Sequence, residues 1–183
     1  MKYEYLKFKN DMKKTKKTIG LIIIFKDKEK CFTAALQMRG GFNTEKNKPE
    51  TYKNASQLTV HGGINKKENE IEALLRETKE ELGAKFAKII ELNKNKLIEV
   101  NRIKNDKISV VNFGLILTKI DLDKIKINKQ TGGSLRLISK NEIRNIRELK
   151  PSEKTNGIAD KNEIVMFSDD IEAVKLAFEK LTK

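Results

Sequence analysis

The chain has 183 residues and a net charge of +13, and 38% of its residues are hydrophobic. This length fits one domain with a sizeable core, and the apolar residues gather in periodic bursts, which excludes wholesale disorder. The longest burst, at 19–25, is far shorter than the roughly 20 residues that cross a bilayer. Cys31 is the only cysteine, and the charged N-terminus lacks the apolar core of a secretion signal. We therefore expect a cytoplasmic protein without disulfides or a membrane span.

The positive charge has two interpretations. A surplus of lysine attracts polyanions such as nucleotides or RNA. However, only six positive residues are arginine, and the chain is rich in Lys, Asn and Ile together, as AT-rich codon usage would produce. Aromatic residues make up 6% of the chain, which is unlike the stacking surfaces of single-strand binders. A dedicated nucleic-acid module is therefore not indicated.

The N-terminal third begins with a predicted hairpin. We assign residues 1–16 to an extension or edge strand, and 17–183 to one domain. The apolar runs at 17–26 and 30–39 predict two paired strands, with Cys31 as buried filler in the second. The stretch at 40–55 contains two glycines and one proline and has little periodicity, which predicts a long loop.

The periodicity becomes helical after a short strand expected at 57–61. Asn69 with Glu72 three residues later has the pattern of a capping box, and Gly83 is typical of a helix C-terminus. These signals predict a helix over 70–82.

The second half mixes strands and helices. Strands are expected at 87–100, 107–120 and 133–138, and a short helix at 141–146. A last helix should begin at the N-cap Ser168 with Asp169 and Asp170 in its first turn, and an apolar stripe follows. Several strands with two substantial helices predict an α/β layered domain.

The predicted helix at 70–82 carries an unusual acidic face. Glu70, Glu77, Glu80 and Glu81 fall within an arc of about 100°. Like charges one turn apart cost a few tenths of a kcal/mol each, so a cation is expected beside them. Carboxylate oxygens with this spacing suit Mg²⁺ or Mn²⁺. A solvated acidic face neutralised by nearby lysines is the structural alternative.

The spacing of the whole stretch resembles the signature of the Nudix hydrolase (MutT-like) family, G-x5-E-x7-R-E-U-x-E-E-x-G-U, where U is aliphatic. All seven fixed positions match over 23 residues: Gly62, Glu68, Arg76, Glu77, Glu80, Glu81 and Gly83. Thr78 and the small Ala84 depart from the aliphatic positions, and Val60-His61 replaces the usual Pro-Gly. Thr78 lies on the packing arc, so we expect lower stability and intact chemistry.

This resemblance implies a fold and an activity. The fold would be the Nudix-type α/β/α sandwich with a mixed sheet. The activity would be Mg²⁺- or Mn²⁺-dependent hydrolysis of a diphosphate bond in a nucleoside diphosphate linked to another group. Two alternatives remain: a pyrophosphohydrolase or decapping enzyme acting on RNA 5′ ends, and a nucleotide binder without turnover. The three intact glutamates argue against the binder. Homodimers are common in the family.

The resemblance also implies roles for individual residues. Glu77 and Glu81 would ligate the metal, and Glu80 would be either a third ligand or the base. Arg76 would hold Glu77, and Glu68 would form a structural ion pair. The backbone carbonyl of His61 is a further candidate ligand, although simple packing at a strand end would also explain this residue.

Arg39 is a separate candidate. It leaves a strand toward the long loop, where family members often bind substrate. A plain turn at this point is an equal alternative.

Overall fold

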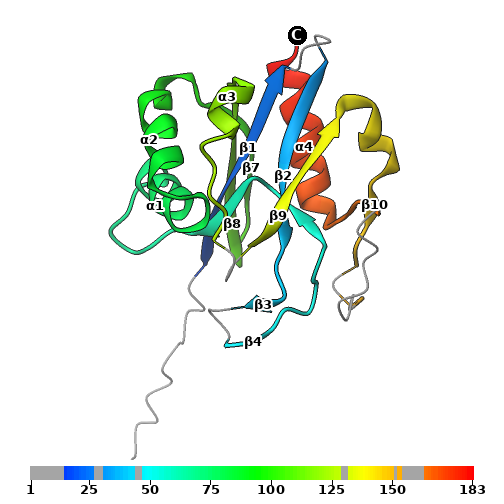
Figure 1. Cartoon of the computed structure of the whole chain (residues 1–183). Helices are drawn as coiled ribbons and strands as arrows, with labels where there is room; N and C mark the ends of the chain where they lie inside the picture. The colour runs from blue at the N-terminus through cyan, green and yellow to red at the C-terminus, as the bar shows by residue number, and fades with distance from the viewer. Residues whose placement is uncertain (1–14, 27–30, 44–46, 129–131, 151, 154–162) are drawn as a thin grey trace, which may run out of the picture.

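A mixed seven-stranded sheet forms the centre of the chain in its computed structural model (Figure 1), which describes residues 15–26, 31–43, 47–128, 132–150, 152–153 and 163–183. The strand order is β5-β2-β1-β8-β7, with β6 also on β1 and β9 also on β2. Its strands are β1 (Lys16–Lys26), β2 (Phe32–Arg39), β5 (Ser56–Gln57), β6 (Val60–Gly63), β7 (Ile98–Lys104), β8 (Ile108–Leu117) and β9 (Gly132–Ser139). The long β1 and β8 are parallel, whereas the other pairs are antiparallel.

The remaining elements are four helices, two short 3₁₀ helices and two small ribbons, counted over the described residues. The helices are α1 (Glu70–Leu82), α2 (Ala84–Leu92), α3 (Lys119–Leu122) and α4 (Ser168–Leu181). The 3₁₀ helices are η1 (Lys94–Lys96) and η2 (Lys140–Asn145). The ribbons pair β3 (Phe42–Asn43) with β4 (Lys48–Pro49), and β10 (Arg147–Glu148) with β11 (Val165–Met166).

Strand β1 divides one edge between two partners. Its second half pairs with β2 and its first half with β6. Thr59 lies at the branch, fully buried, where its hydroxyl accepts a hydrogen bond from the Ile23 amide at 2.9 Å and donates one to the Ala35 carbonyl. This hydroxyl satisfies backbone groups that the divergence of the strands would leave unpaired. It thereby fixes where β6, and the residues after it, leave the sheet.

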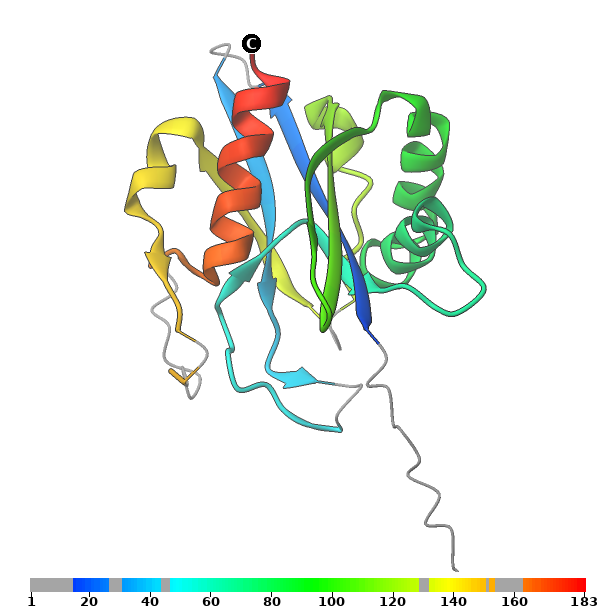
Figure 2. The ribbon, with the colours of Figure 1, turned by 180° about the vertical axis from the view of Figure 1, so that it is seen from behind.

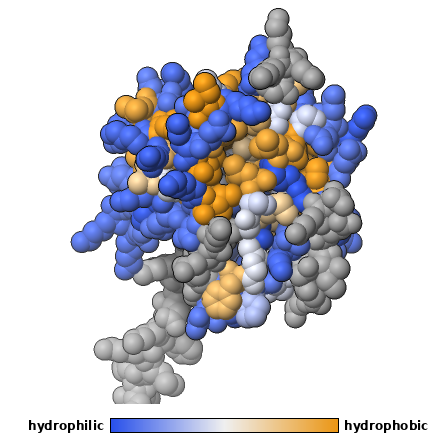
Figure 3. Space-filling view, in the orientation of Figure 1, coloured by the Kyte–Doolittle hydropathy of each residue, from blue (hydrophilic) through white to orange (hydrophobic). Residues whose placement is uncertain are grey.

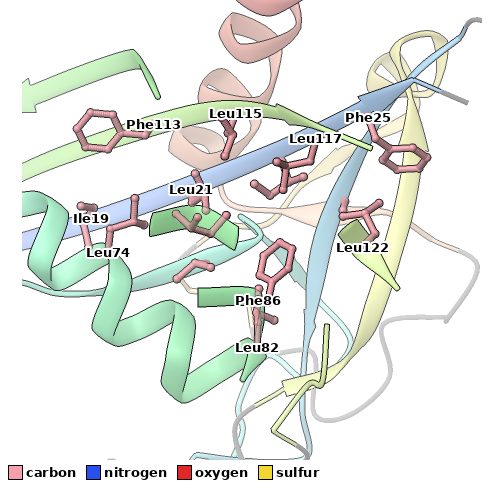
Figure 4. Close-up of a cluster of buried hydrophobic side chains, with 14 of the residues drawn as sticks. Ile19, Leu21, Phe25, Leu74, Leu82, Phe86, Phe113, Leu115, Leu117 and Leu122 are labelled. Carbon is pink, nitrogen blue, oxygen red and sulfur yellow. The ribbon is translucent and has the colours of Figure 1, made fainter. Parts of the chain in front are cut away.

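Helices cover both faces of the sheet, as the two opposite views show (Figures 1 and 2). Side chains of β1 alternate between the faces. Ile19, Leu21 and Ile23 enter the core beneath α1 and α2, part of which Figure 4 shows, whereas Ile22 and Ile24 enter the core beneath α4. The continuous apolar run of β1 is thus explained by burial on both faces. This arrangement is the predicted α/β/α sandwich with a mixed sheet.

Part of the front face has no helix over it. Hydrophobic side chains are visible in the middle of the space-filling view, over the sheet between the helices and β9 (Figure 3). Leu137 of β9 pairs with Ala35 and is 50% exposed. No helix in the described part of the chain is long and apolar enough to cross a membrane.

Several predicted elements match the structure, and others were wrong. The strands at 17–26, 107–120 and 133–138 correspond to β1, β8 and β9. The predicted strand at 87–100 instead contains most of α2, then η1 and the start of β7. Buried Phe86, Ala87 and Ile90 alternate with exposed lysines at helical and not strand spacing, and this short stripe packs under the sheet.

Three smaller predictions also need correction. Cys31 is exposed, because pairing of β2 with β1 extends only as far as Phe32. Ser168 is the first residue of α4, and Phe167 is the N-cap, with no side-chain capping bond. The loop predicted at 40–55 contains the β3–β4 ribbon. The connection between the predicted strands at 17–26 and 30–39 and most of the N-terminal extension lie outside the described residues.

Candidate active site

The acidic strip of α1, which consists of Glu70, Glu77, Glu80 and Glu81, is positioned by the way α1 begins and packs. Asn69 accepts hydrogen bonds from the amides of Ile71 and Glu72, both at 3.0 Å, and the Glu72 carboxylate accepts one from the Asn69 amide at 2.9 Å. This predicted capping box fixes the first turn. Ala73, Leu74, Thr78 and Leu82 are buried under the sheet. The adjoining face carries Glu77, Glu80 and Glu81, and it turns toward the end of β6.

Arg76 ties the helix to the loop before it. Its guanidinium donates to both Glu68 carboxylate oxygens, at 2.8 and 3.1 Å, and to the Gly63 carbonyl at 2.7 Å. It also donates to Glu77 Oε1 at 2.7 Å. The planar fork of arginine suits such a multidentate arrangement. One side chain thus links β6, the loop and the acidic strip.

Two carboxylates of α1 lie side by side against β6. The amide of Gly63 donates to Glu77 Oε1 at 3.1 Å, and the amide of His61 donates to Glu81 Oε2 at 3.4 Å. Two alternate residues of β6 thus contact two carboxylates that lie one turn apart on α1. Between them, a Cβ on Gly62 would lie 1.9 Å from Glu77 Cδ. Only glycine allows Glu77 to approach the strand this closely.

The other two glutamates of the strip differ from this pair. The Glu80 side chain is 57% exposed and makes a long contact of 3.4 Å with Arg76. Glu70 is held elsewhere, because Arg102 of β7 donates to both of its oxygens, at 2.6 and 3.0 Å. The structure therefore places Glu77 and Glu81 against β6 with Glu80 near Arg76, and it holds Glu70 apart from them.

The electrostatics of the pair Arg76–Glu77 favour a further cation. Burial raises the pKa of Glu77, and the nearby Glu80 raises it further, although Arg76 opposes both effects. In contrast, the hydrogen bonds from Arg76 lower the pKa of Glu68. Arg76 thus satisfies Glu68 more fully than Glu77. A second positive charge beside Glu77 and Glu80 would relieve their repulsion.

The donor set fits a hard divalent cation. Carboxylate oxygens are the ligands that Mg²⁺ and Mn²⁺ prefer, and Glu77 and Glu81 of α1 supply them beside His61 and Gly63 of β6. Among the residues described, no three His, Cys, Asp or Glu side chains are already gathered as a metal-binding group. Here amides of β6 and the Arg76 guanidinium hold these oxygens.

The C-terminal end of the acidic strip is fixed by a segment that the sequence did not single out. Asn128 donates its amide to the Glu81 carbonyl at 2.8 Å, and its side chain to the Glu80 carbonyl at 3.4 Å. The last carbonyls of an α-helix have no amide partner within that helix, so Asn128 supplies the missing donors here. Because Asn128 is 47 residues beyond Glu81, no local signal in the sequence could predict this contact.

A cavity of about 260 Å³ adjoins the carboxylates. It is lined by Arg39, Gln57, His61, Phe167, Ser168, Asp169 and Asp170. His61 contributes to both sites, since its backbone amide contacts Glu81. The structure thus brings Arg39 and His61, two sequence candidates, to one cavity. The sequence had marked Asp169 and Asp170 only as first-turn residues of a helix.

Arg39 is held in place from two sides. It forms an ion pair with Glu50 at 3.4 Å. Its guanidinium also lies over the rings of Tyr52 and Phe167, at 5.9 and 5.8 Å from their centroids. Cation–π contacts of this kind orient a guanidinium. Arg39 is therefore a fixed wall of the cavity.

Comparisons with known proteins identify the fold. No protein-family model and no curated protein matches the chain. Among solved structures, a MutT/nudix family protein from Enterococcus faecalis matches with a TM-score of 0.60 and 15% identity, covering 100% of this chain and 65% of that one. A mutT/nudix family protein from Listeria innocua matches with a TM-score of 0.60 and 18% identity, covering 91% and 94%.

A third solved structure is the NUDIX domain of Shewanella oneidensis NrtR complexed with ADP ribose. It matches with a TM-score of 0.57 and 11% identity, covering 91% of this chain and 88% of that one. The present chain spans about two thirds, 65%, of the length of the Enterococcus protein. Layer order, the mixed sheet and these likenesses agree, and the chain has the MutT/Nudix fold.

Proposed function

We propose that this chain is a metal-dependent pyrophosphohydrolase that cleaves a diphosphate bond in a nucleoside diphosphate linked to another group. The observation that carries the proposal is the pair Glu77 and Glu81, held against alternate residues of β6 with exposed Glu80 beside them. Binding of a cation, and of phosphate through that cation, would explain why these carboxylates lie together in a chain of net charge +13.

Each glutamate has a role in this proposal. Glu77 and Glu81 would hold Mg²⁺ or Mn²⁺, with the His61 carbonyl as a further ligand. A divalent ion at this position supplies charge to neutralise the phosphate oxygens and to acidify a water molecule. Glu80 is the most exposed and least tightly held of the three. This freedom suits a base that accepts the proton of the attacking water, and a third ligand is the alternative.

Arg76 and Gly62 support these groups without contacting the substrate. Arg76 fixes one oxygen of Glu77 through a bond of 2.7 Å, so that its second oxygen has a defined direction. Gly62 leaves the space that this carboxylate occupies. Preorganised ligands lower the cost of binding the ion and of reaching the transition state.

The proposal is tested by two substitutions and a substrate panel. Purified protein is incubated with nucleoside triphosphates, nucleotide diphosphate derivatives and 5′-triphosphorylated RNA, with Mg²⁺ or Mn²⁺, and phosphate release is measured after phosphatase treatment. Glu80→Gln and Glu81→Gln should each lower turnover by about 100-fold or more. The matched control Glu91→Gln alters an exposed glutamate of α2 and should retain full activity. Near-normal rates for both site variants would contradict the proposed site.

A further inference from the structure

The last turn of α1 carries Glu80 and Glu81, and its backbone is held from outside the helix. Gly83 follows this turn with φ of +91°, a conformation that interrupts the helical backbone before α2 begins. The last four carbonyls of an α-helix have no amide partner within the helix. The Gly83 amide donates to the first of these carbonyls, that of Lys79, at 3.2 Å. The remaining three need donors from another part of the chain.

One short segment after α3 supplies these three donors. The Lys126 amide donates to the Leu82 carbonyl at 2.9 Å, and the Asn128 amide donates to the Glu81 carbonyl at 2.8 Å. The Asn128 side chain adds a bond of 3.4 Å to the Glu80 carbonyl. All four terminal carbonyls of α1 thus have a donor, and two alternate residues of one segment provide three of the donors.

The core anchors this segment. Ile125 and Ile127 are partly buried and pack against the cluster that contains Leu82 and Phe86, part of which Figure 4 shows. The Ile125 amide also donates to the carbonyl of Leu122, the last residue of α3, at 3.0 Å. A segment that is tied to the core in this way has little freedom to move. Its donors therefore hold the end of α1 in a fixed position against the core.

The side-chain contacts of Glu80 and Glu81 are longer than those of Glu77. Glu77 accepts a bond of 2.7 Å from Arg76. Glu80 contacts the same guanidinium at 3.4 Å, and Glu81 contacts the His61 amide at 3.4 Å. Bonds near 3.5 Å are weak, and the terminal turns of helices open easily. The directions of these two carboxylates therefore depend strongly on the backbone beneath them.

The donors also act on the charge of the helix end. The free carbonyls at a helix C-terminus carry a partial negative charge. Next to Glu80 and Glu81, this charge adds to the repulsion between the carboxylates. Hydrogen-bond donors placed on these carbonyls offset the partial charge and keep the turn closed.

We propose that Asn128 is a positioning residue for the reaction, whose two donors fix the last turn of α1 and thereby the directions of Glu80 and Glu81. Asn128 acts through these glutamates and not through the substrate. Its effect on turnover rests on the proposed function, whereas its effect on the helix end does not.

The variant Asn128→Ala tests this role, because it removes the side-chain donor and keeps the backbone amide. In metal-free protein, hydrogen–deuterium exchange of the amides at 80–83 should become about three- to tenfold faster, the value of one neutral hydrogen bond. Mn²⁺ affinity, measured by electron paramagnetic resonance, should fall by a similar factor. The kcat should fall about three- to tenfold with KM within about twofold of wild type, because no substrate contact is lost.

Asn93 provides the matched control. It closes the end of α2 in the same way, with its side chain donating to the Ile89 carbonyl at 2.9 Å, and α2 carries no glutamate of the acidic strip. Asn93→Ala should speed exchange at the end of α2 and leave kcat and Mn²⁺ affinity at wild-type values. Asn128→Gln keeps an amide donor, so its kcat should lie closer to wild type than that of Asn128→Ala.

Three results would overturn the inference. The first is wild-type exchange at 80–83 in Asn128→Ala. The second is faster exchange with unchanged kcat and Mn²⁺ affinity, since the bond would then be structural alone. The third is an equal loss of kcat and Mn²⁺ affinity in Asn93→Ala. If exchange and Mn²⁺ affinity change as expected but the wild type cleaves no diphosphate substrate, the positioning role stands and the proposed hydrolase activity fails.

Discussion

Gly62 allows a direct test of how closely the acidic helix must approach the sheet. A Cβ at this position would lie 1.9 Å from Glu77 Cδ and 2.3 Å from Glu77 Oε1. Carbon atoms need about 3.5 Å of separation, so Gly62→Ala should push the carboxyl back by about 1.5 Å. This displacement breaks the bonds of Glu77 to the Gly63 amide, at 3.1 Å, and to Arg76, at 2.7 Å.

The fold should survive this change better than the site. The clashing atoms are the end of a flexible side chain, which can turn toward solvent. We expect the free energy of unfolding to fall by only about 1–2 kcal/mol, partly offset by the reduced freedom of the unfolded chain when glycine becomes alanine. A displaced ligand should weaken Mn²⁺ binding about 10- to 100-fold. Turnover should fall by about 100-fold or more.

The neighbouring glycine provides the matched control. A Cβ on Gly63 would meet nothing within 4 Å among the described residues, so Gly63→Ala should leave metal binding and turnover close to wild type. Mn²⁺ affinity is measured by electron paramagnetic resonance, which needs no substrate, and stability by urea unfolding. Wild-type Mn²⁺ affinity in Gly62→Ala, or equal damage from Gly63→Ala, would refute the reasoning.

Three further predictions concern stability. Arg76→Lys should lower the free energy of urea unfolding by about 1–2 kcal/mol, because one ammonium group cannot reach Glu68, Glu77 and the Gly63 carbonyl together. An unchanged midpoint of urea unfolding would count against this network. Thr78 is fully buried, and its hydroxyl donates to the Leu74 carbonyl at 2.7 Å, a bond that competes with the hydrogen bonds of the helix backbone. Thr78→Val should therefore raise the free energy of thermal unfolding by about 0.5–1 kcal/mol. A lower free energy of unfolding would contradict the expected cost of a buried threonine. Burial raises the pKa of Asp170 from 3.8 to about 7, so from about pH 4 to 7 the folded chain keeps a proton that the unfolded chain releases, and stability falls as the pH rises. The free energy of unfolding of Asp170→Asn should therefore rise relative to that of the wild type from about pH 4 to 7, and the difference should stay constant above about pH 7. A difference that does not change with pH would disprove this coupling.

The sequence predicted best where the pattern is local. The helix at 70–82 follows from its capping box and from Gly83, and the strand at 17–26 from its continuous apolar run; both are present as α1 and β1. The predicted strand at 87–100 was wrong. This segment forms most of the helix α2, whose side chains Phe86 and Ile90 are buried in the core against the sheet. Short apolar stretches do not distinguish a strand from a helix without that context.

The sequence by itself determined that three glutamates share one helix face, with two glycines and an arginine at fixed distances along the chain. Spacing along a helix is a local property, so it needed no tertiary information. Only the tertiary structure decided that Glu70 pairs with Arg102, and that Phe167 and Asp170 at the start of α4 meet Arg39 of β2 beside His61. Those contacts join segments that are distant in the sequence, and their positions are fixed by the pairing of β1 with β6 and by the packing of α4 on the sheet.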